Sequence, residues 1–275
     1  QAFLRRQQKL AAILVTGQVR SLLSTLASGE TVAENIRRHL FQYMFGSALQ
    51  KDSGTGIDVF WVLDTTRREG EPEPGNVSVC EPLRPRDCDR CNLICQVQLQ
   101  EELDLNGLPA SVVESTFANR LHSTMFGLLA FQRVHRLMQA HAREHRITYE
   151  WIVRLRPDIF FHGRLPSVHS LPLDRIAIIG RQWPADYFAV GRPSAMNVFF
   201  TSWDGLTQNS VLQYRLSHTW MLTQTGPAGN GYTRNWATEE ILYHWLDMHG
   251  IPVVAHDDIN AEVCRLVRGK IMGGW

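Results

Sequence analysis

The chain has 275 residues, of which 44% are hydrophobic, and this is enough for a sizeable core in one large domain. Its 28 basic and 27 acidic side chains give a formal charge of +1, which excludes a strong overall field toward nucleic acid or an anionic membrane. No run approaches the roughly 20 apolar residues that cross a bilayer, so we expect no membrane span within these residues. Any anion binding must come from local groups of charge.

The first part of the chain has the pattern of an α/β sheet. Residues 11–15 are a short apolar run that ends in the polar segment 16–20, as expected of a buried strand that leads into a loop. Apolar side chains recur at helical spacing through residues 31–45. Residues 57–63 are rich in β-branched and aromatic side chains and predict a second strand. Strand, helix and strand in this order begin an α/β fold.

Residues 66–110 differ in composition, with several prolines and glycines and little periodicity, and predict an insertion within a single domain of residues 1–275. Four of the five cysteines of the chain lie in this insertion: Cys80, Cys88, Cys91 and Cys95. Two local disulfides would explain them, and so would one structural zinc site. We favour the disulfides.

A glycosylation sequon begins at Asn76, and together with the cysteines it favours the secretory pathway. The sequence begins with Gln1 rather than Met, so we expect a signal or membrane anchor to precede it and the Golgi lumen to be the compartment. A cytoplasmic location is the alternative.

The middle of the chain predicts the longest helix and a central strand. The helix covers residues 114–146, and the strand covers residues 149–156. Pro157 ends this strand because it has no N–H to donate to the sheet. Asp158 is therefore expected at the carboxyl edge of the sheet, where open α/β sheets bind ligands.

The remaining pattern completes an α/β fold with a mixed, mostly parallel sheet flanked by helices. Two further strands are expected, at residues 175–179 and 187–190. Helices are expected over residues 194–204 and 238–249, before a last strand at 251–255.

Asp158 and the two arginines before it are the first candidates for chemistry. A carboxylate at a strand end is a suitable ligand for Mg or Mn, and a solvated acid is the alternative interpretation. Arg154 and Arg156 alternate with Val153 and Leu155 and so are expected to point to one face. Two such arginines favour a phosphate ligand, with ion pairing inside the protein as the alternative.

Five segments, in this order, resemble the motifs of GT-A-type glycosyltransferases of the WavE-like polysaccharide and surface-glycan group. They are TGQVR at 16–20, DVF at 58–60, YEWIVRLRPD at 149–158, DYFAVG at 186–191 and EEIL at 239–242. The resemblance implies a single GT-A, Rossmann-like domain that moves a sugar from a nucleotide-sugar donor to a glycan or glycoconjugate acceptor. A non-catalytic protein that binds nucleotide sugars or carbohydrate is the alternative.

The resemblance also implies roles for residues that would bind the donor. The loop at 16–20 would face the nucleotide through Thr16, Gly17, Gln18 and Arg20. Asp158 would take the place of the last aspartate of the D-x-D metal motif, with His256 as a further ligand of Mn or Mg. Arg156 stands where the first aspartate is expected, so arginines could neutralise the diphosphate without a metal. A late basic group would close on the diphosphate through Arg265, Arg268 and Lys270.

Three further carboxylates would act on the sugar or the acceptor. The resemblance implies that Asp186 lies near the donor sugar or acceptor and that Glu239 or Glu240 lies near the acceptor hydroxyl. A carboxylate there could act as general base by taking the proton of that hydroxyl. The alternative for the two glutamates is that they only stabilise the start of a helix. A dehydrogenase or methyltransferase is disfavoured because the 16–20 loop lacks the G-x-G-x-x-G turn.

Overall fold

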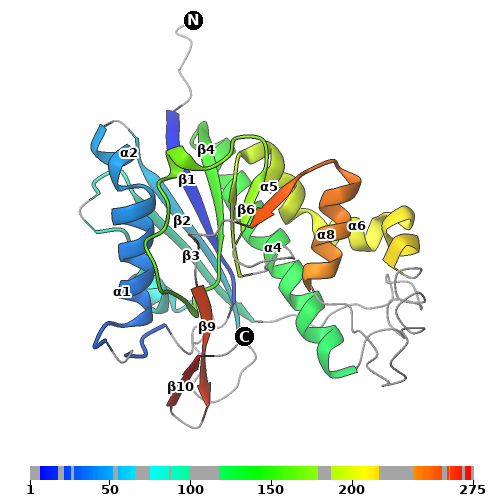
Figure 1. The fold of residues 1–275 in the computed structure, drawn as a ribbon, viewed down its shortest axis with the longest axis horizontal. Coiled ribbons are helices and arrows are strands. Elements are labelled where there is room, and N and C mark those ends of the chain that lie inside the picture. Colours follow the sequence, from blue (N-terminus) through cyan, green and yellow to red (C-terminus); the bar gives the residue numbers. More distant parts are fainter. Residues whose placement is uncertain are drawn as a thin grey trace, which may run out of the picture.

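The computed structural model contains a seven-stranded sheet covered by helices on both faces (Figure 1). The residues it describes are 7–17, 22–25, 28–51, 55–65, 75–86, 88–99, 118–178, 187–216, 238–255, 259, 261–267 and 270–273. The strand order of the main sheet is β3-β2-β1-β4-β7-β6-β8. The bounds of these strands are β1 (Gln7–Val15), β2 (Ile57–Thr65), β3 (Asn92–Leu99), β4 (Ile147–Leu155), β6 (Ile176–Ile178), β7 (Phe188–Gly191) and β8 (Val253–Ala255).

The main sheet is mixed and mostly parallel. Strands β3, β2, β1 and β4 run parallel, whereas β7 is antiparallel to both β4 and β6. In the centre, Ile13 lies opposite Val59 of β2 on one side and Val153 of β4 on the other, and none of the three is more than 2% exposed. Such continuous burial is expected of strands covered on both faces. The predicted α/β fold is confirmed at this level.

Strands β1 and β4 begin earlier than their apolar runs predict. β1 starts at Gln7, and Lys9 within it is only 3% exposed although it is charged. The structure accommodates this charge because the ammonium of Lys9 forms an ion pair with the carboxylate of Asp58 on β2. A pattern of apolar residues cannot show this pairing, since it depends on how two strands lie side by side.

The helices before β2 cover one face of the main sheet, and the later α-helices cover the other. On one face lie α1 (Val32–Arg37), the π-helix η1 (Arg38–Met44) and α2 (Gly46–Lys51). On the other lie α4 (Ala118–Glu144), α5 (Pro193–Phe200), α6 (Ser202–Gln208) and α8 (Thr238–Met248). The helix predicted over residues 194–204 is two helices, because α5 ends at Phe200, α6 begins at Ser202 and Thr201 caps both.

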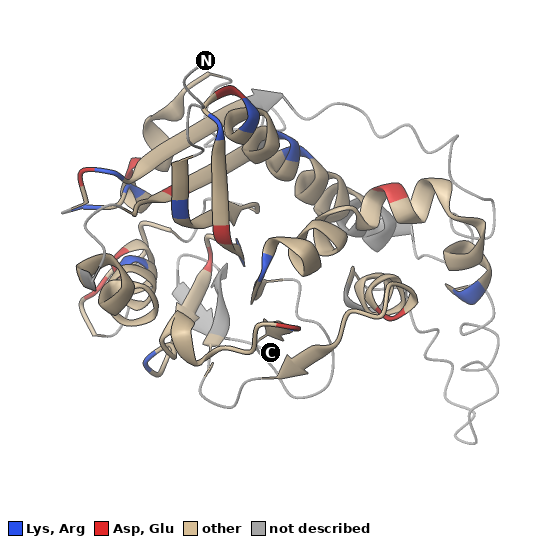
Figure 2. Ribbon diagram, turned by 90° about the horizontal axis from the view of Figure 1, so that it is seen from above, with Lys and Arg blue, Asp and Glu red and all other residues tan. Residues whose placement is uncertain are grey.

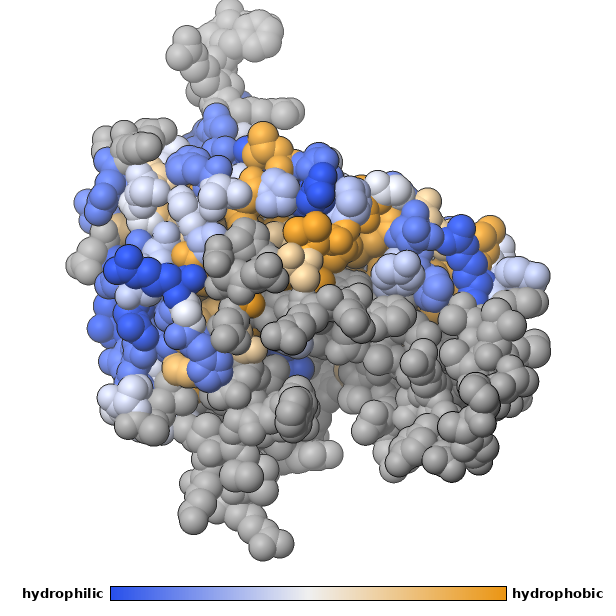
Figure 3. Space-filling view, in the orientation of Figure 1, coloured by the Kyte–Doolittle hydropathy of each residue, from blue (hydrophilic) through white to orange (hydrophobic). Residues whose placement is uncertain are grey.

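The surface agrees with the balanced composition of the chain. Basic and acidic residues are interspersed over the described ribbon (Figure 2). In the space-filling view the flank formed by α1 and α2 is mostly hydrophilic (Figure 3). A charged ligand would therefore bind at a local cluster of charged side chains rather than at one broad charged surface.

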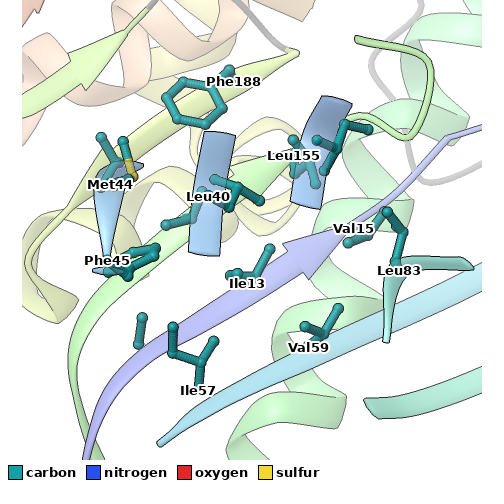
Figure 4. Close-up of a cluster of buried hydrophobic side chains, with 14 of the residues drawn as sticks. Ile13, Val15, Leu40, Met44, Phe45, Ile57, Val59, Leu83, Leu155 and Phe188 are labelled. Atoms are coloured by element: carbon teal, nitrogen blue, oxygen red, sulfur yellow. The ribbon is translucent and has the colours of Figure 1, made fainter. Parts of the chain in front are cut away.

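The α1 side of the core joins its helices to the parallel strands. Leu40, Met44 and Phe45 belong to the same buried cluster as Ile13 and Val59 (Figure 4). Burial of each such side chain contributes roughly 1.5–3 kcal/mol. This packing fixes the helix layer on the sheet.

The cysteine-rich segment contributes a strand to the main sheet, which the sequence interpretation did not anticipate. β3 lies inside the predicted insertion 66–110 and pairs in parallel with β2, with Phe60 opposite Ile94. A 3-10 helix, η2 (Val77–Leu83), precedes it. The prolines and cysteines around β3 obscured its short alternating pattern.

The four cysteines of this segment form two disulfides, Cys80–Cys95 and Cys88–Cys91. The predicted disulfides are therefore confirmed in the structure. A four-thiolate zinc site would require both bridges to open, because zinc binds the free thiolate.

Two antiparallel strands lie near the end of the chain. Strands β9 (Ala261–Val267) and β10 (Lys270–Gly273) are antiparallel, and β9 also pairs with β5 (Ile159–Phe161). This places β9 beside the segment that follows Asp158. Among the described residues, no helix is both long and apolar enough to cross a membrane.

Candidate functional site at the carboxyl edge of the sheet

The ends of β1 and β4 bring together four of the candidates, Thr16, Gly17, Arg156 and Asp158. These strands are neighbours in the sheet. Strands β2 and β3 lie on the other side of β1 from β4. The strand order thus reverses between β1 and β4, and in open α/β sheets the crevice outside such a reversal is the usual ligand site. Val15 lies opposite Leu155 at the last paired position, and the N–H of Thr16 donates to the carbonyl of Leu155 at 3.2 Å.

Gly17 is required by the close approach of two chain segments. Its φ of +129° is a conformation that side-chain-bearing residues rarely adopt. A Cβ at this position would lie 3.1 Å from Cδ of Pro157 and 3.9 Å from Cγ of Arg156. The glycine therefore lets the loop after β1 lie against the segment that carries Arg156.

Arg156 and Asp158 form an ion pair that spans Pro157. Nε of Arg156 donates to Oδ1 of Asp158 and Nη2 donates to Oδ2, each at 2.8 Å. The Asp158 side chain is 9% exposed and that of Arg156 is 29% exposed. The backbone N–H of Arg156 also donates to the carbonyl of Tyr187 at 2.9 Å, which ties the segment to the start of β7. Both oxygens of Asp158 are thus engaged by an arginine, and neither is a bare metal ligand.

Arg154 has different surroundings from Arg156. It is 2% exposed, its guanidinium carbon lies 4.6 Å from the centre of the Phe131 ring on α4, and Nη1 donates to the carbonyl of Leu155. The described contacts of the two arginines thus differ, with Arg154 over the Phe131 ring and Arg156 paired with Asp158. Arg154 lies beneath the helix layer, while Arg156 lies at the edge of the sheet.

The other predicted site residues are described only in part. The backbones of Glu239 and Glu240 lie in the first turn of α8, that of Arg265 in β9 and that of Lys270 in β10. The following predicted residues lie outside the described residues: Gln18, Arg20, Asp186, His256 and Arg268. The described part of the chain contains no group of three or more His, Cys, Asp or Glu residues arranged to hold a metal ion.

Asp58, from one of the segments that carry the resemblance, lies at the opposite edge of the sheet. It is fully buried at the start of β2, where it accepts hydrogen bonds from the hydroxyl of Tyr149 and from Nδ2 of Asn92, each at 2.7 Å, besides its ion pair with Lys9. Burial and the carboxylate raise the pKa of Tyr149 well above its usual range. Nε2 of His141 is 3.6 Å from Oδ2 of Asp58, and burial lowers the pKa of this histidine. This cluster joins β1, β2, β3 and β4 and has a structural role.

Sequence reasoning did not identify two places where charged side chains lie together. The first is the Arg156–Asp158 pair, since ion pairing inside the protein was an alternative for Arg156 but Asp158 was not identified as its partner. The second is a pocket on the α1 flank that brings Arg37 and Arg86 together. No local signal connects those two arginines, because one is on a helix and the other in the cysteine-rich segment.

No known protein family matches the chain, and no curated protein sequence matches it either. The structure defines an α/β protein with a mostly parallel sheet, two disulfides and an Arg–Asp pair at the reversal of strand order.

Proposed function

We propose that the chain is a GT-A-type glycosyltransferase that moves a sugar from a nucleotide-sugar donor to a glycan or glycoconjugate acceptor. The observation that carries the proposal is the Arg156–Asp158 pair, which lies beside Gly17 at the carboxyl ends of β1 and β4. This is the position at which doubly wound sheets bind nucleotides. The close approach of the loop at Gly17 also suits a backbone that contacts a diphosphate.

Arg156 is suited to the charge that develops during transfer. As the bond from the sugar to the nucleotide breaks, negative charge grows on the diphosphate leaving group. A guanidinium presents five N–H donors in a planar arrangement that matches phosphate oxygens, and Asp158 accepts two of the five. In this proposal Asp158 orients Arg156 and Arg156 stabilises the leaving group.

A resident Mn or Mg ion fits the described residues less well. Both oxygens of Asp158 are bound by Arg156, and the described part of the chain has no cluster of three or more His, Cys, Asp or Glu residues that could hold a metal ion. Metal binding at Asp158 would first require Arg156 to turn away. We therefore assign no step to a metal, and His256 remains a proposed ligand only for the metal-dependent version of the site.

The acceptor would be activated by one of the remaining acids. We propose Glu239 or Glu240 as general base, with Asp186 beside the sugar. Their support is the resemblance, together with the position of the two glutamates in the first turn of α8. Adjacent helical residues point about 100° apart, so one of the two glutamates is expected to face the acceptor.

The two disulfides support an oxidising compartment, and we propose the secretory pathway, with the Golgi lumen as the site of action. Sugar transfer to glycoconjugates in that lumen is consistent with the exposed sequon at Asn76.

The test is a donor screen with paired variants. The disulfide-bonded protein is incubated with UDP-, GDP- and CMP-sugars, with Mn and with a chelator, and the released nucleotide is measured. Arg156→Gln and Asp158→Asn should lose this activity. Asp174→Asn is the matched control, because Asp174 forms a similar two-bond pair with Arg175 at an exposed position before the start of β6, away from the carboxyl ends of β1 and β4. No release with any donor, under either condition, would refute the assignment as a transferase.

A non-catalytic binding protein is the second candidate, and the same pair favours it. Arg156 held by Asp158 can bind a diphosphate without any acid or base nearby. In that case a nucleotide sugar raises the melting temperature of the wild type but not of Arg156→Gln, while no nucleotide is released.

A further inference from the structure

A second candidate site lies on the flank of the molecule, separate from the strand ends. It is a pocket of about 610 Å³ between the α1–η1–α2 layer and the segment that follows η2. Small-molecule sites generally have volumes of roughly 300–1,000 Å³. The pocket combines charged, amide and apolar side chains, so its chemistry can be considered group by group.

The acidic residues of the pocket already have partners. Glu30 accepts a hydrogen bond from Nη2 of Arg38 at 2.7 Å. Glu34 forms a capping box with Thr31, because its carboxylate accepts from both the N–H and the hydroxyl of Thr31 at 2.8 Å. These contacts occupy both carboxylates and one of the three arginines that line the pocket.

The other two arginines, Arg37 and Arg86, share the pocket without such a partner. Neither guanidinium has a hydrogen bond or ion pair with a residue that the structure describes. The pKa of Arg37 is lowered, first by burial and then by the positive charge of Arg86, and the negative charge of Glu34 opposes this in part. An anion bound beside both guanidinium groups would stabilise their positive charges.

The chain holds Arg86 in this position by covalent and packing contacts. Pro85, directly before it, is buried, and Cys88, two residues after it, is bridged to Cys91, the residue before β3. On the opposite side, Arg37 lies in the last turn of α1, which packs on the sheet. The two cations are therefore presented by two fixed elements.

The rest of the lining suits a polar molecule with one apolar side. Gln42 and Gln50 can each donate and accept hydrogen bonds through their amides. Phe41 and Leu49 are half-buried and pack against the core from the same layer. Sugars combine hydroxyl groups with an apolar ring face and match such a lining.

We propose that this pocket binds an oxyanion, a phosphate or sulfate ester carried by a sugar, between Arg37 and Arg86. A planar guanidinium binds such a group through paired hydrogen bonds. The proposal does not depend on the transferase assignment, since the pocket lies on the α1 flank rather than at the ends of β1 and β4.

Calorimetric titration of the disulfide-bonded protein tests the proposal. The probes are glucose 6-phosphate, glucose 6-sulfate, unmodified glucose, inorganic phosphate and inorganic sulfate. We expect at least one sugar ester to bind and glucose not to bind. Arg37→Gln and Arg86→Gln should each weaken binding about tenfold or more, since each removes a charged hydrogen-bonding partner. Arg37→Lys should retain part of the affinity because it keeps the charge.

Arg84→Gln is the matched control. Arg84 lies two residues before Arg86 in the same segment, but its guanidinium is paired with Glu81 and it does not line the pocket. This variant should bind like the wild type. Thermal unfolding of every variant separates loss of binding from loss of folding.

The arms of the titration distinguish the sources of the oxyanion. Tighter binding of a sugar ester than of the free ion supports the proposal, and preference between the two esters identifies phosphate or sulfate. The proposal is overturned if no ester binds at millimolar concentration, or if Arg37→Gln, Arg86→Gln and Arg84→Gln all bind like the wild type. Neither result bears on nucleotide release at Arg156.

Discussion

Arg156 donates one hydrogen bond to each carboxylate oxygen of Asp158, and the two residues are separated only by Pro157. This short bridge lies where the strand order reverses, and it replaces the isolated acid expected at this edge with a neutral pair. Its first consequence is that Asp158 should act through Arg156, whatever ligand binds there.

Asp158→Asn should lower both stability and donor binding. An amide keeps the size of the side chain but offers only one acceptor oxygen and no charge, so Arg156 loses its fixed orientation. We expect a loss of about 1–3 kcal/mol in the free energy of unfolding, measured in urea. Asp174→Asn should leave stability nearly unchanged, because that pair is exposed. Equal effects of the two variants would contradict a special role for the Asp158 pair.

Gly17→Ala should disturb the same site from the neighbouring loop. The substitution combines an unfavourable φ with a Cβ placed 3.1 Å from Cδ of Pro157, and we expect it to cost about 1–3 kcal/mol. Gly29→Ala separates the two causes, because Gly29 has a φ of +84° but no atom within 4 Å of the added Cβ. Chemical denaturation of both variants should show the larger loss for Gly17→Ala.

The buried Asp58 cluster should be among the most sensitive places in the fold. Lys9→Met leaves a carboxylate buried without its cation, and we expect a loss of about 3–5 kcal/mol in unfolding free energy. The double variant Lys9→Met/Asp58→Leu should lose less than either single variant, because no unpaired charge remains. A double-mutant cycle in urea measures this difference, and additive losses would argue against the pairing.

His39 should make the protein less stable in acid. Burial, and then the charge of Arg38, lowers the pKa of this histidine from 6.5 to about 4. A histidine with a lowered folded pKa is neutral when folded but takes up a proton when unfolded, so the unfolded state binds more protons between these values. Its stability contribution is therefore complete above the unfolded pKa of 6.5 and is lost as the pH falls toward 4.

The check is unfolding in urea at several pH values across that window for the wild type, His39→Gln and the exposed control His169→Gln. The slope of stability against pH should flatten in His39→Gln and persist in His169→Gln. It should not vanish, because burial also lowers the pKa values of His135, His141 and His244.

The two disulfides should differ in their contribution. Cys80–Cys95 closes a loop with a sequence separation of 15, and Cys88–Cys91 one of only 3. Since loop-closure entropy grows with loop length, Cys80→Ser/Cys95→Ser should lower the unfolding free energy by about 3 kcal/mol and the other pair of substitutions by less. Mass spectrometry without reduction should first find both bridges and no bound zinc.

Local pattern alone was sufficient for the central strands β1, β2 and β4 and for the position of Asp158. The apolar runs at 11–15 and 57–63 predicted central strands because such strands are buried on both faces, and Pro157 marked the end of β4 because it cannot donate to the sheet. These features depend on neighbours in the chain. β3 was not recognised in the same way because its apolar residues are interrupted by glutamines and it lies in a segment rich in prolines, glycines and cysteines.

Only the tertiary structure decided which charges meet. Lys9 finds Asp58 because β1 and β2 lie side by side, and Arg37 meets Arg86 because a disulfide-linked segment packs against α1. Such contacts depend on strand register and on how the chain crosses between layers, which no short pattern of residue types records. For the same reason the sequence placed Asp158 at the edge of the sheet, while the structure alone showed that Arg156 holds it there.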